Sequence, residues 1–217
     1  MSKLPICYAG FLWWGVMGMT QAADPQAIED LDKLGSCVGC DLSEVNFRGK
    51  NLKGVNLSGA NLEKADLRNA YLEKAKLVGA NLKNAQLSDA NLSGAKLKGA
   101  NLSGADLSDA SLFKANLEGA KLGKAVLRRA NLSNALMAGV YLKQSNLASA
   151  NLFNADLSAA YLKGANLEDA NLSKSNLEGA NLDESSLSGA SLVGANITDA
   201  SMREAETEGT AMPTDAQ

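Results

Sequence analysis

The stretch Asn91-Leu92-Ser93-Gly94-Ala95 and its copy Asn101-Leu102-Ser103-Gly104-Ala105 show a five-residue unit that continues without a gap over residues 41–205. Every fifth position from 42 to 202 holds a large apolar residue, and two residues before each of them, except at Lys50, stands a small one, usually Ala. Helices and strands repeat their side-chain directions about every 3.6 and 2.0 residues, so a period of five fits neither element. The pattern predicts a coil that turns a corner every five residues.

The position two residues after each large apolar residue indicates how the corner is made. It is often Gly or Asn, as at Gly54, Asn84 and Gly94, and these residues accept the positive φ that the third position of a type II turn requires. Charged residues at other corners, such as Lys64 and Arg129, indicate a different turn type there. Four corners would close a square coil, and about eight coils spaced by roughly 4.8 Å would form a rod on the order of 40 Å long.

The pattern Ala-(Asn/Asp)-Leu-x-x resembles that of the pentapeptide-repeat family. The resemblance implies an all-β fold, a right-handed quadrilateral β-helix, over residues 41–205. Competing solenoids do not fit, because the sequence lacks both the leucine-rich-repeat period of about 20–29 residues and the Gly-rich calcium-binding repeat. All three prolines lie outside the repeat, as expected where each coil donates backbone hydrogen bonds to its neighbours.

Residues 1–22 have the pattern of a secretory signal peptide. Lys3 precedes an apolar run from Leu4 to Met19, and the segment ends in small residues at Ala22 and Ala23. The run is shorter than the roughly 20 residues that span a bilayer, so we expect cleavage rather than a permanent membrane anchor. Export would place the protein in the periplasm. The resemblance to exported cyanobacterial members of the family adds the thylakoid lumen.

Residues 23–40 are expected to form a short N-terminal capping helix followed by a cysteine pair. Asp24 as N-cap, Pro25 at the first helical position and Gly35 after the last one predict a helix over residues 24–34. Such a helix would cover the open end of the first coil. The apolar face of the helix is predicted to contain Ala27, Ile28, Leu31 and Leu34.

Cys37 and Cys40 are predicted to meet at the first corner, because counting in fives places both at inward positions. In an exported protein they would form a disulfide, which we expect to fasten the helix to the rod. The alternatives are a redox pair, haem attachment and a zinc site. The chain has no His, which excludes C-x-x-C-H haem attachment, and a zinc site would lack its other ligands. A redox C-x-x-C motif usually opens a helix beside a sheet, whereas a β-coil is expected to follow Cys40.

The residues give little support to catalysis. The chain lacks His, the commonest general base, and the repeat implies no concave pocket for its surface carboxylates. We therefore expect a non-catalytic protein without a cofactor or a metal.

A surface ladder offers a candidate site for a protein partner, because residues 20 apart should stack on neighbouring coils. Tyr141 and Tyr161 form such a pair, and Lys143 and Lys163 stack beside them. Two interpretations are open: the ladder is a docking patch, since Tyr often anchors interfaces, or its rings only stabilise the sheet. Other outward apolar residues between positions 113 and 161 favour the middle of the rod as the contact zone.

Charge bears on an alternative function that the resemblance implies. Some pentapeptide-repeat proteins mimic a DNA duplex in shape and negative charge and act on DNA gyrase. Residues 41–205 carry 19 Lys and Arg against 17 Asp and Glu, whereas a DNA mimic should be acidic along its length. Binding to nucleic acid is not expected either, because the basic half lacks interleaved aromatic residues. The sequence favours an exported rod that acts as a structural or protein-binding module.

Residues 206–217 are polar and out of phase with the repeat apart from Met212, which predicts a disordered C-terminal tail. No amphipathic helix follows the repeat to pair two rods. We therefore expect a monomer, or weak end-to-end association through the last coil near Ile197 and Met202.

Overall fold

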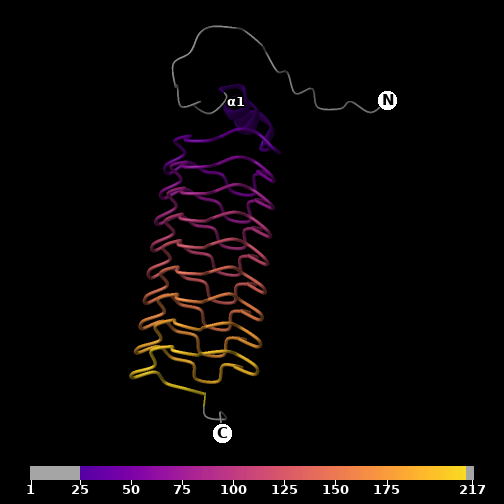
Figure 1. The fold of residues 1–217 in the computed structure, drawn as a ribbon. Helices are drawn as coiled ribbons and strands as arrows, with labels where there is room; N and C mark the ends of the chain where they lie inside the picture. Colours follow the sequence, from indigo (N-terminus) through magenta and orange to yellow (C-terminus); the bar gives the residue numbers. More distant parts are fainter. Residues whose placement is uncertain (1–24, 214–217) are drawn as a thin grey trace, which may run out of the picture.

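A computed structural model describes residues 25–213, which form a rod of stacked coils with one helix at its N-terminal end (Figure 1). This helix, α1, spans Pro25–Leu34. The predicted signal peptide of residues 1–22 and the predicted N-cap Asp24 lie outside the described residues. The fold therefore consists of α1 and the coil that follows it.

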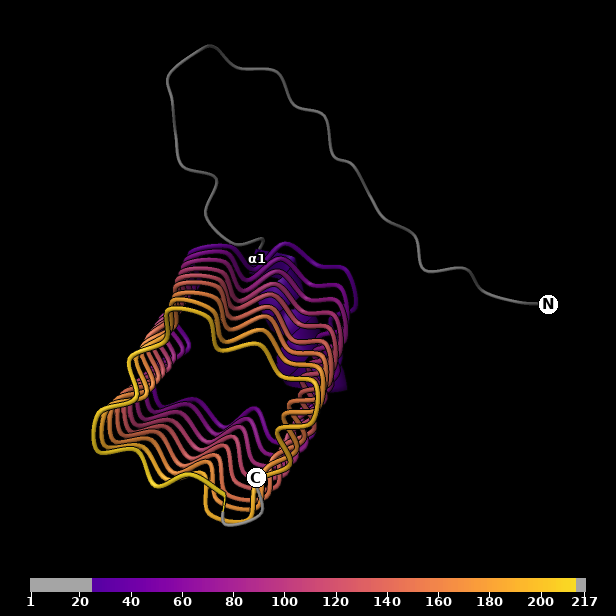
Figure 2. The ribbon, with the colours of Figure 1, turned by 60° about the horizontal axis from the view of Figure 1, so that its bottom comes forward.

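Parallel bridges between residues 20 apart hold each coil to the next. The first bridge joins Ser36 to Asn56 and the last joins Ser191 to Ala211. All of these bridges are isolated, so residues 25–213 contain no continuous strand longer than a single bridge. Seen from its end, the coil has four sides (Figure 2), which confirms the predicted square coil of 20 residues.

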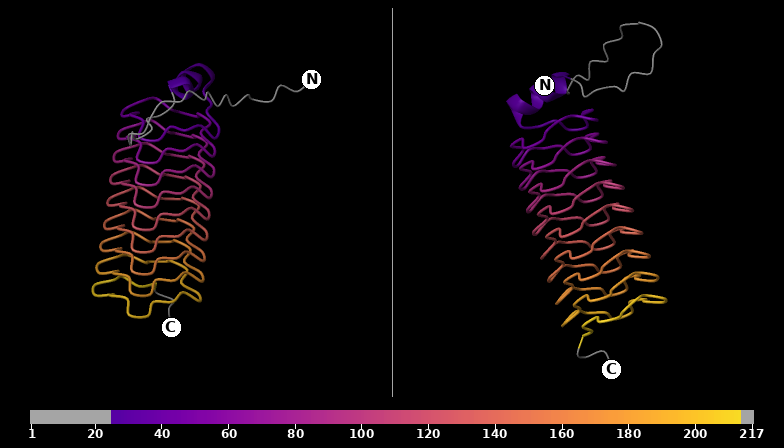
Figure 3. Two further views of the ribbon diagram at one scale, coloured as in Figure 1. Left: turned by 45° about the horizontal axis from the view of Figure 1, so that its top comes forward. Right: turned by 90° about the vertical axis from the view of Figure 1, so that its left-hand side faces the viewer.

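The interior of the rod holds one layer of large apolar side chains and one layer of small ones. The inward Leu residues are buried from Leu42 to Leu192, and the inward Ala residues are covered almost as completely. The coils stack in register along the whole rod (Figure 3). Ser145, Ser175 and Ser185 replace Ala, and each hydroxyl donates to the carbonyl oxygen of the Leu three residues earlier. These buried hydroxyl groups are therefore satisfied within their own corners.

All corners use the same turn, so the prediction of a different turn type at charged corners was wrong. Every fifth residue from 39 to 209 has a positive φ, including Lys64 at 57° and Arg129 at 56°. The N–H of the residue after the positive φ donates to the carbonyl oxygen of the Leu that opens the corner, as from Ala65 to Leu62 at 3.1 Å. Only the third residue of each turn has a positive φ, as in type II turns. Stacking of identical coils imposes this geometry even where the residue is not Gly.

The preference for Asn or Asp before each Leu follows from the hydrogen bonds of a corner. Most backbone N–H groups donate to backbone carbonyl oxygens. The N–H of the first residue after the Leu instead needs an acceptor from a side chain. The Asn or Asp oxygen two residues earlier supplies it, so no N–H in the unit is left unpaired. In residues 101–105 each backbone N–H donates one hydrogen bond: Asn101 to Ala80 O (2.9 Å), Leu102 to Lys121 O (2.7 Å), Ser103 to Asn101 Oδ1 (3.2 Å), Gly104 to Gly123 O (3.0 Å) and Ala105 to Leu102 O (3.0 Å).

Asn131→Ala is expected to lower the free energy of unfolding by about 1–3 kcal/mol, because it leaves a buried backbone donor unpaired. Asn131 Oδ1 accepts from the N–H of Ser133 at 3.1 Å and from its hydroxyl at 2.7 Å, and Ser133 is only 8% exposed. The control is Lys96→Ala at the same position of another unit, since a Lys side chain accepts no hydrogen bond. Urea unfolding compares the two variants, and equal losses would contradict the explanation.

Helix α1 lies on the N-terminal end of the rod (Figure 1). Ala27 and Leu31 are 5% and 2% exposed and join the core, and Ile28 packs against it partly buried. Leu34 was predicted on the same face but is 72% exposed, so that prediction was wrong. The helix ends at Leu34, and Gly35, with a φ of 61°, turns the chain back toward the coil. The side chain of Leu34 therefore does not reach the core.

The coil continues beyond the predicted start of the C-terminal tail. Glu206 and Ala211 form parallel bridges with Ser186 and Ser191. The prediction of disorder from residue 206 was therefore wrong for residues 206–213. The backbone ladder that adds a coil does not require a Leu at the inward position, which is why polar residues can extend the rod.

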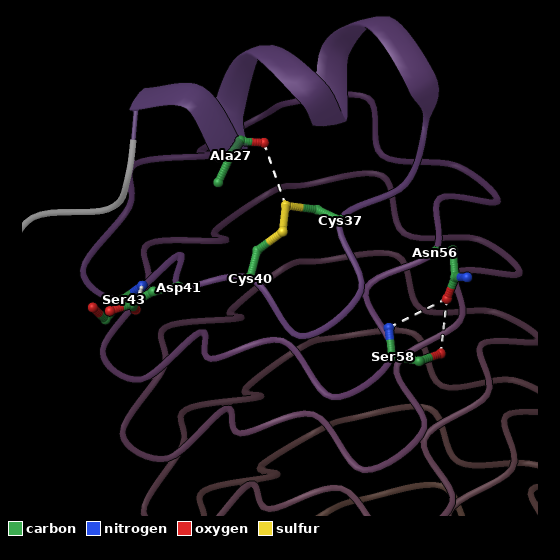
Figure 4. Close-up of a disulfide and its surroundings, with 7 residues drawn as sticks. All are labelled: Ala27, Cys37, Cys40, Asp41, Ser43, Asn56 and Ser58. Carbon is green, nitrogen blue, oxygen red and sulfur yellow. Dashed lines mark hydrogen bonds between the residues drawn. A yellow bond between two sulfur atoms is a disulfide. The ribbon is translucent and has the colours of Figure 1, made fainter. Parts of the chain in front are cut away.

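Cys37 and Cys40 form the predicted disulfide at the first corner (Figure 4). Cys37 is 3% exposed, and its sulfur lies 3.4 Å from the carbonyl oxygen of Ala27 in α1. A disulfide sulfur carries no proton, so this is a packing contact. The disulfide closes the corner in place of the turn hydrogen bond, which Cys40 does not make within residues 25–213. The covalent link thus lies within the coil. It does not itself fasten α1 to the rod, so that expectation from the sequence was wrong.

Candidate partner-binding site

The structure places the predicted Tyr pair side by side on one face of the rod. Tyr141 and Tyr161 are joined by a parallel bridge, and they are 41% and 55% exposed. Their ring centroids are 6.0 Å apart, and their planes are inclined by 32°. Aromatic rings attract one another at centroid distances of about 4.5–7 Å. The two rings therefore support each other while much of their surface stays open to solvent.

Gly123, one coil earlier, provides the space for the ring of Tyr141. A Cβ atom at this position would lie 3.2 Å from Cε1 of Tyr141. The backbone does not require Gly here, because Gly123 does not have a positive φ. A shallow depression of about 360 Å³ opens beside the ring, lined by Gly123, Lys124, Tyr141, Lys143 and Gln144.

The two predicted lysines differ in their surroundings. Lys163 forms an ion pair with Glu184 in the next coil at 2.9 Å. The hydrogen bond from its ammonium group to Glu184 raises the pKa of Lys163, so its charge is retained up to a strongly alkaline pH. Lys143 is exposed and makes no ion pair with any of the described residues. Lys143 is therefore the more available cation.

Sequence reasoning missed the neighbouring residues of the preceding coil. Lys121 forms a bridge with Tyr141, so the 20-residue spacing could have found it, and the same spacing relates Lys124 to Gln144. Gly123 could not be found in this way, because its role depends on the direction of the Tyr141 ring. We call the following set the tyrosine–lysine strip: Lys121, Lys124, Tyr141, Lys143, Tyr161 and Lys163.

Phe113 and Phe153 are two of the outward apolar residues in the segment 113–161, which the sequence favours as the contact zone, but they lie on another side of the coil. The ammonium groups of Lys114 and Lys174 lie 5.0 and 5.5 Å from the ring centroids of Phe113 and Phe153. Ser133, one coil from each Phe, is buried between their positions. Each ammonium group covers part of one ring, although Phe113 stays 37% exposed, and these contacts favour a packing role for both Phe residues.

Clusters suited to metal binding are not found in the part of the chain that the structure describes. Residues 25–213 bring no three His, Cys, Asp or Glu side chains together in a way that could hold a metal ion. The same residues include no helix that is long and apolar enough to cross a membrane.

The four-sided coil, its five-residue corners and its exposed ladders define a β-solenoid with flat faces. Pentapeptide repeats match the chain in eight copies, which together cover residues 36–206. The chain belongs to the pentapeptide repeat family. Members of this family form right-handed β-helices, which supports the handedness expected from the sequence.

Solved structures of the same family resemble the rod. HetL from the cyanobacterium Nostoc sp. strain PCC 7120, a protein involved in heterocyst differentiation regulation, is 29% identical, with 90% of this chain and 99% of HetL covered and a TM-score of 0.58. QnrB1, a plasmid-mediated fluoroquinolone resistance protein, is 18% identical over 82% of this chain and 90% of its own, with a TM-score of 0.45. No curated protein matches the chain.

Proposed function

We propose that the protein is an exported, non-catalytic rod that binds a protein partner through the tyrosine–lysine strip. The observation that carries the proposal is the exposed pair of Tyr141 and Tyr161 beside Lys143, which forms no ion pair within residues 25–213. Tyr offers a large, rigid contact surface with a polar end, which is why it is frequent at the centre of interfaces. Mutual stacking fixes the two rings before binding, so little side-chain entropy remains to be lost.

A binding role agrees with what the chain offers chemically. The sequence contains no His, and some outward carboxylates are held in ion pairs between coils, such as Glu118 with Lys98 and Asp109 with Arg129. HetL, the 29% identical structure, is described by its part in a regulatory process. A mimic of DNA would need an acidic surface, whereas the strip is basic.

Export is the second element of the proposal, and it rests on the pattern of residues 1–22. We expect the native N-terminus to be Ala23 or Asp24, with the mature protein in the periplasm or the thylakoid lumen. N-terminal sequencing of the protein from its native source tests this expectation. An intact Met1 on the native protein would overturn the export element and leave the binding element standing.

The binding element is tested by cross-linking in cells followed by purification of the tagged protein. Tyr141→Ser combined with Tyr161→Ser should abolish the capture of a specific partner that the unchanged protein retains. Tyr71→Ser is the control, because Tyr71 is 53% exposed but occupies another side of the coil. Equal capture by all three proteins would show that the strip is not the contact. Absence of capture by the unchanged protein would favour a purely structural role.

A further inference from the structure

We propose that the tyrosine–lysine strip binds an acidic peptide segment that lies along the axis of the rod. This inference rests on the proposed function and specifies the chemistry of the partner. Five consecutive coils contribute to the face that carries the strip, and from residue 81 to residue 165 this face contains Lys but no Asp or Glu. The residues of the face in these coils are 81–85, 101–105, 121–125, 141–145 and 161–165.

Three of the four lysines of the strip are not neutralised by neighbouring coils. Lys121, Lys124 and Lys143 are exposed and form no ion pair within residues 25–213. Only Lys163, at the C-terminal limit of the strip, has a carboxylate partner, Glu184. Three cations on two consecutive coils thus present an uncompensated positive field, which favours an anionic ligand.

Other cations on the rod show the alternative arrangement, in which a charge is paired with a carboxylate one coil away. Lys98 meets Glu118 at 2.7 Å, and the guanidinium of Arg129 binds both oxygens of Asp109 at 2.6 and 2.7 Å. This pairing lowers the pKa of Asp109 below its usual range. The stacking of coils therefore allows charges on neighbouring coils to neutralise one another, but Lys121, Lys124 and Lys143 of the strip have no such partner within residues 25–213.

The depression beside Tyr141 provides a position for one anionic group. Two cations, Lys124 and Lys143, line it together with the amide of Gln144. A carboxylate placed there could accept charge-assisted hydrogen bonds from both ammonium groups. Gly123 keeps the depression open, because any side chain at that position would crowd the Tyr141 ring.

The direction of the strip favours an extended peptide over a compact ligand. Successive coils are spaced by roughly 4.8 Å, and same-side residues of an extended chain by about 6.6 Å, a difference that flexible Lys side chains can absorb. Tyr141 and Tyr161 would contact the aliphatic parts of the bound segment.

A nucleic acid fits the strip less well. Asp183 and Glu184 follow on the same face, and their charges would repel a longer polyanion that extends past Lys163. The two Tyr rings also lie against each other, which leaves no gap between them for a base to enter. The observations therefore favour a short acidic peptide.

The test uses the mature protein and a fluorescein-labelled octaglutamate peptide, followed by fluorescence anisotropy. We expect binding at about 50 mM salt that is lost at about 500 mM, because the contacts are electrostatic. Lys124→Glu with Lys143→Glu should weaken binding by about tenfold or more, since it reverses both charges at the depression. Lys76→Glu with Lys96→Glu, the same net change of charge on another side, should weaken it by less than about threefold. Circular dichroism shows whether each variant is folded.

Four outcomes would overturn the inference. The first is no binding of octaglutamate at low salt, and the second is an equal loss in both double variants. The third is tighter binding of a single-stranded oligonucleotide than of octaglutamate through the same two lysines. None of these outcomes removes the proposed binding role, which fails if the cross-linked partner is independent of Tyr141 and Tyr161 or if the unchanged protein captures no partner. A neutral octaglutamine peptide should not bind, and equal binding of it would also contradict the inference.

Discussion

Leu102→Ala is expected to lower the free energy of unfolding by about 2–5 kcal/mol, the range for a fully buried Leu whose surroundings cannot collapse. Leu102 is 0% exposed, and Leu82 and Leu122 occupy the same buried position in the coils before and after it. The backbone on both sides is held by bridges to these coils, for example from Asn101 to Asn81 and to Lys121. The coil therefore cannot contract around the cavity.

The control for this prediction is Met202→Ala. Met202 occupies the same inward position in the last part of the rod, but it is only partly buried there, and we expect a loss of about 1 kcal/mol from the smaller area removed from water. Urea unfolding measures both variants, and hydrogen exchange shows which coils open. A similar loss in the two variants would mean that the Leu layer is not the main source of stability.

Leu31→Asp is expected to detach α1 from the end of the rod. Leu31 is 2% exposed and packs with Ala27 into the core, so an Asp there would be a buried, unpaired charge, which costs several kcal/mol. Once α1 leaves, the first coil exposes its apolar interior and its unpaired backbone groups. The expected results are faster hydrogen exchange over residues 36–60, cleavage near α1 in limited proteolysis and self-association at high concentration.

Leu34→Asp provides a matched control within the same helix. Leu34 is 72% exposed, so the same substitution should change the melting temperature by no more than about 2 °C. If Leu34→Asp and Leu31→Asp behave alike, the effect comes from the added charge and not from the loss of the cover. If Leu31→Asp leaves hydrogen exchange in the first coils unchanged, α1 does not protect the end of the rod.

The repeat of large and small apolar residues determined most of the fold. An inward residue at every fifth position can only be satisfied by a chain that turns a corner every five residues, and the structure confirms this from the first bridge at Ser36 to the last at Ala211. The meeting of Cys37 with Cys40 followed from the same count. The pairing of Tyr141 with Tyr161 followed from the 20 residues in each coil. These features repeat with a fixed period, and such a period can be read directly from the sequence.

The remaining features depend on contacts between coils, which a list of residues does not contain. Arg129 adopts a positive φ because stacked coils impose one turn on every corner, although its own preference is against it. Leu34 is exposed because the helix ends there and Gly35, with a φ of 61°, turns the chain back toward the coil. Residues 206–213 are ordered because a coil needs a backbone edge to pair with more than it needs an inward Leu.

The candidate site divides in the same way. Sequence alone determined that the Tyr and Lys residues would share one face, since residues 20 apart must stack. Only the tertiary structure decided that Lys163 is paired with Glu184, that Lys143 is free of ion pairs within the described residues, and that Gly123 provides the space beside Tyr141. The physical reason is that such contacts depend on the directions of side chains from neighbouring coils, and these directions are set by packing.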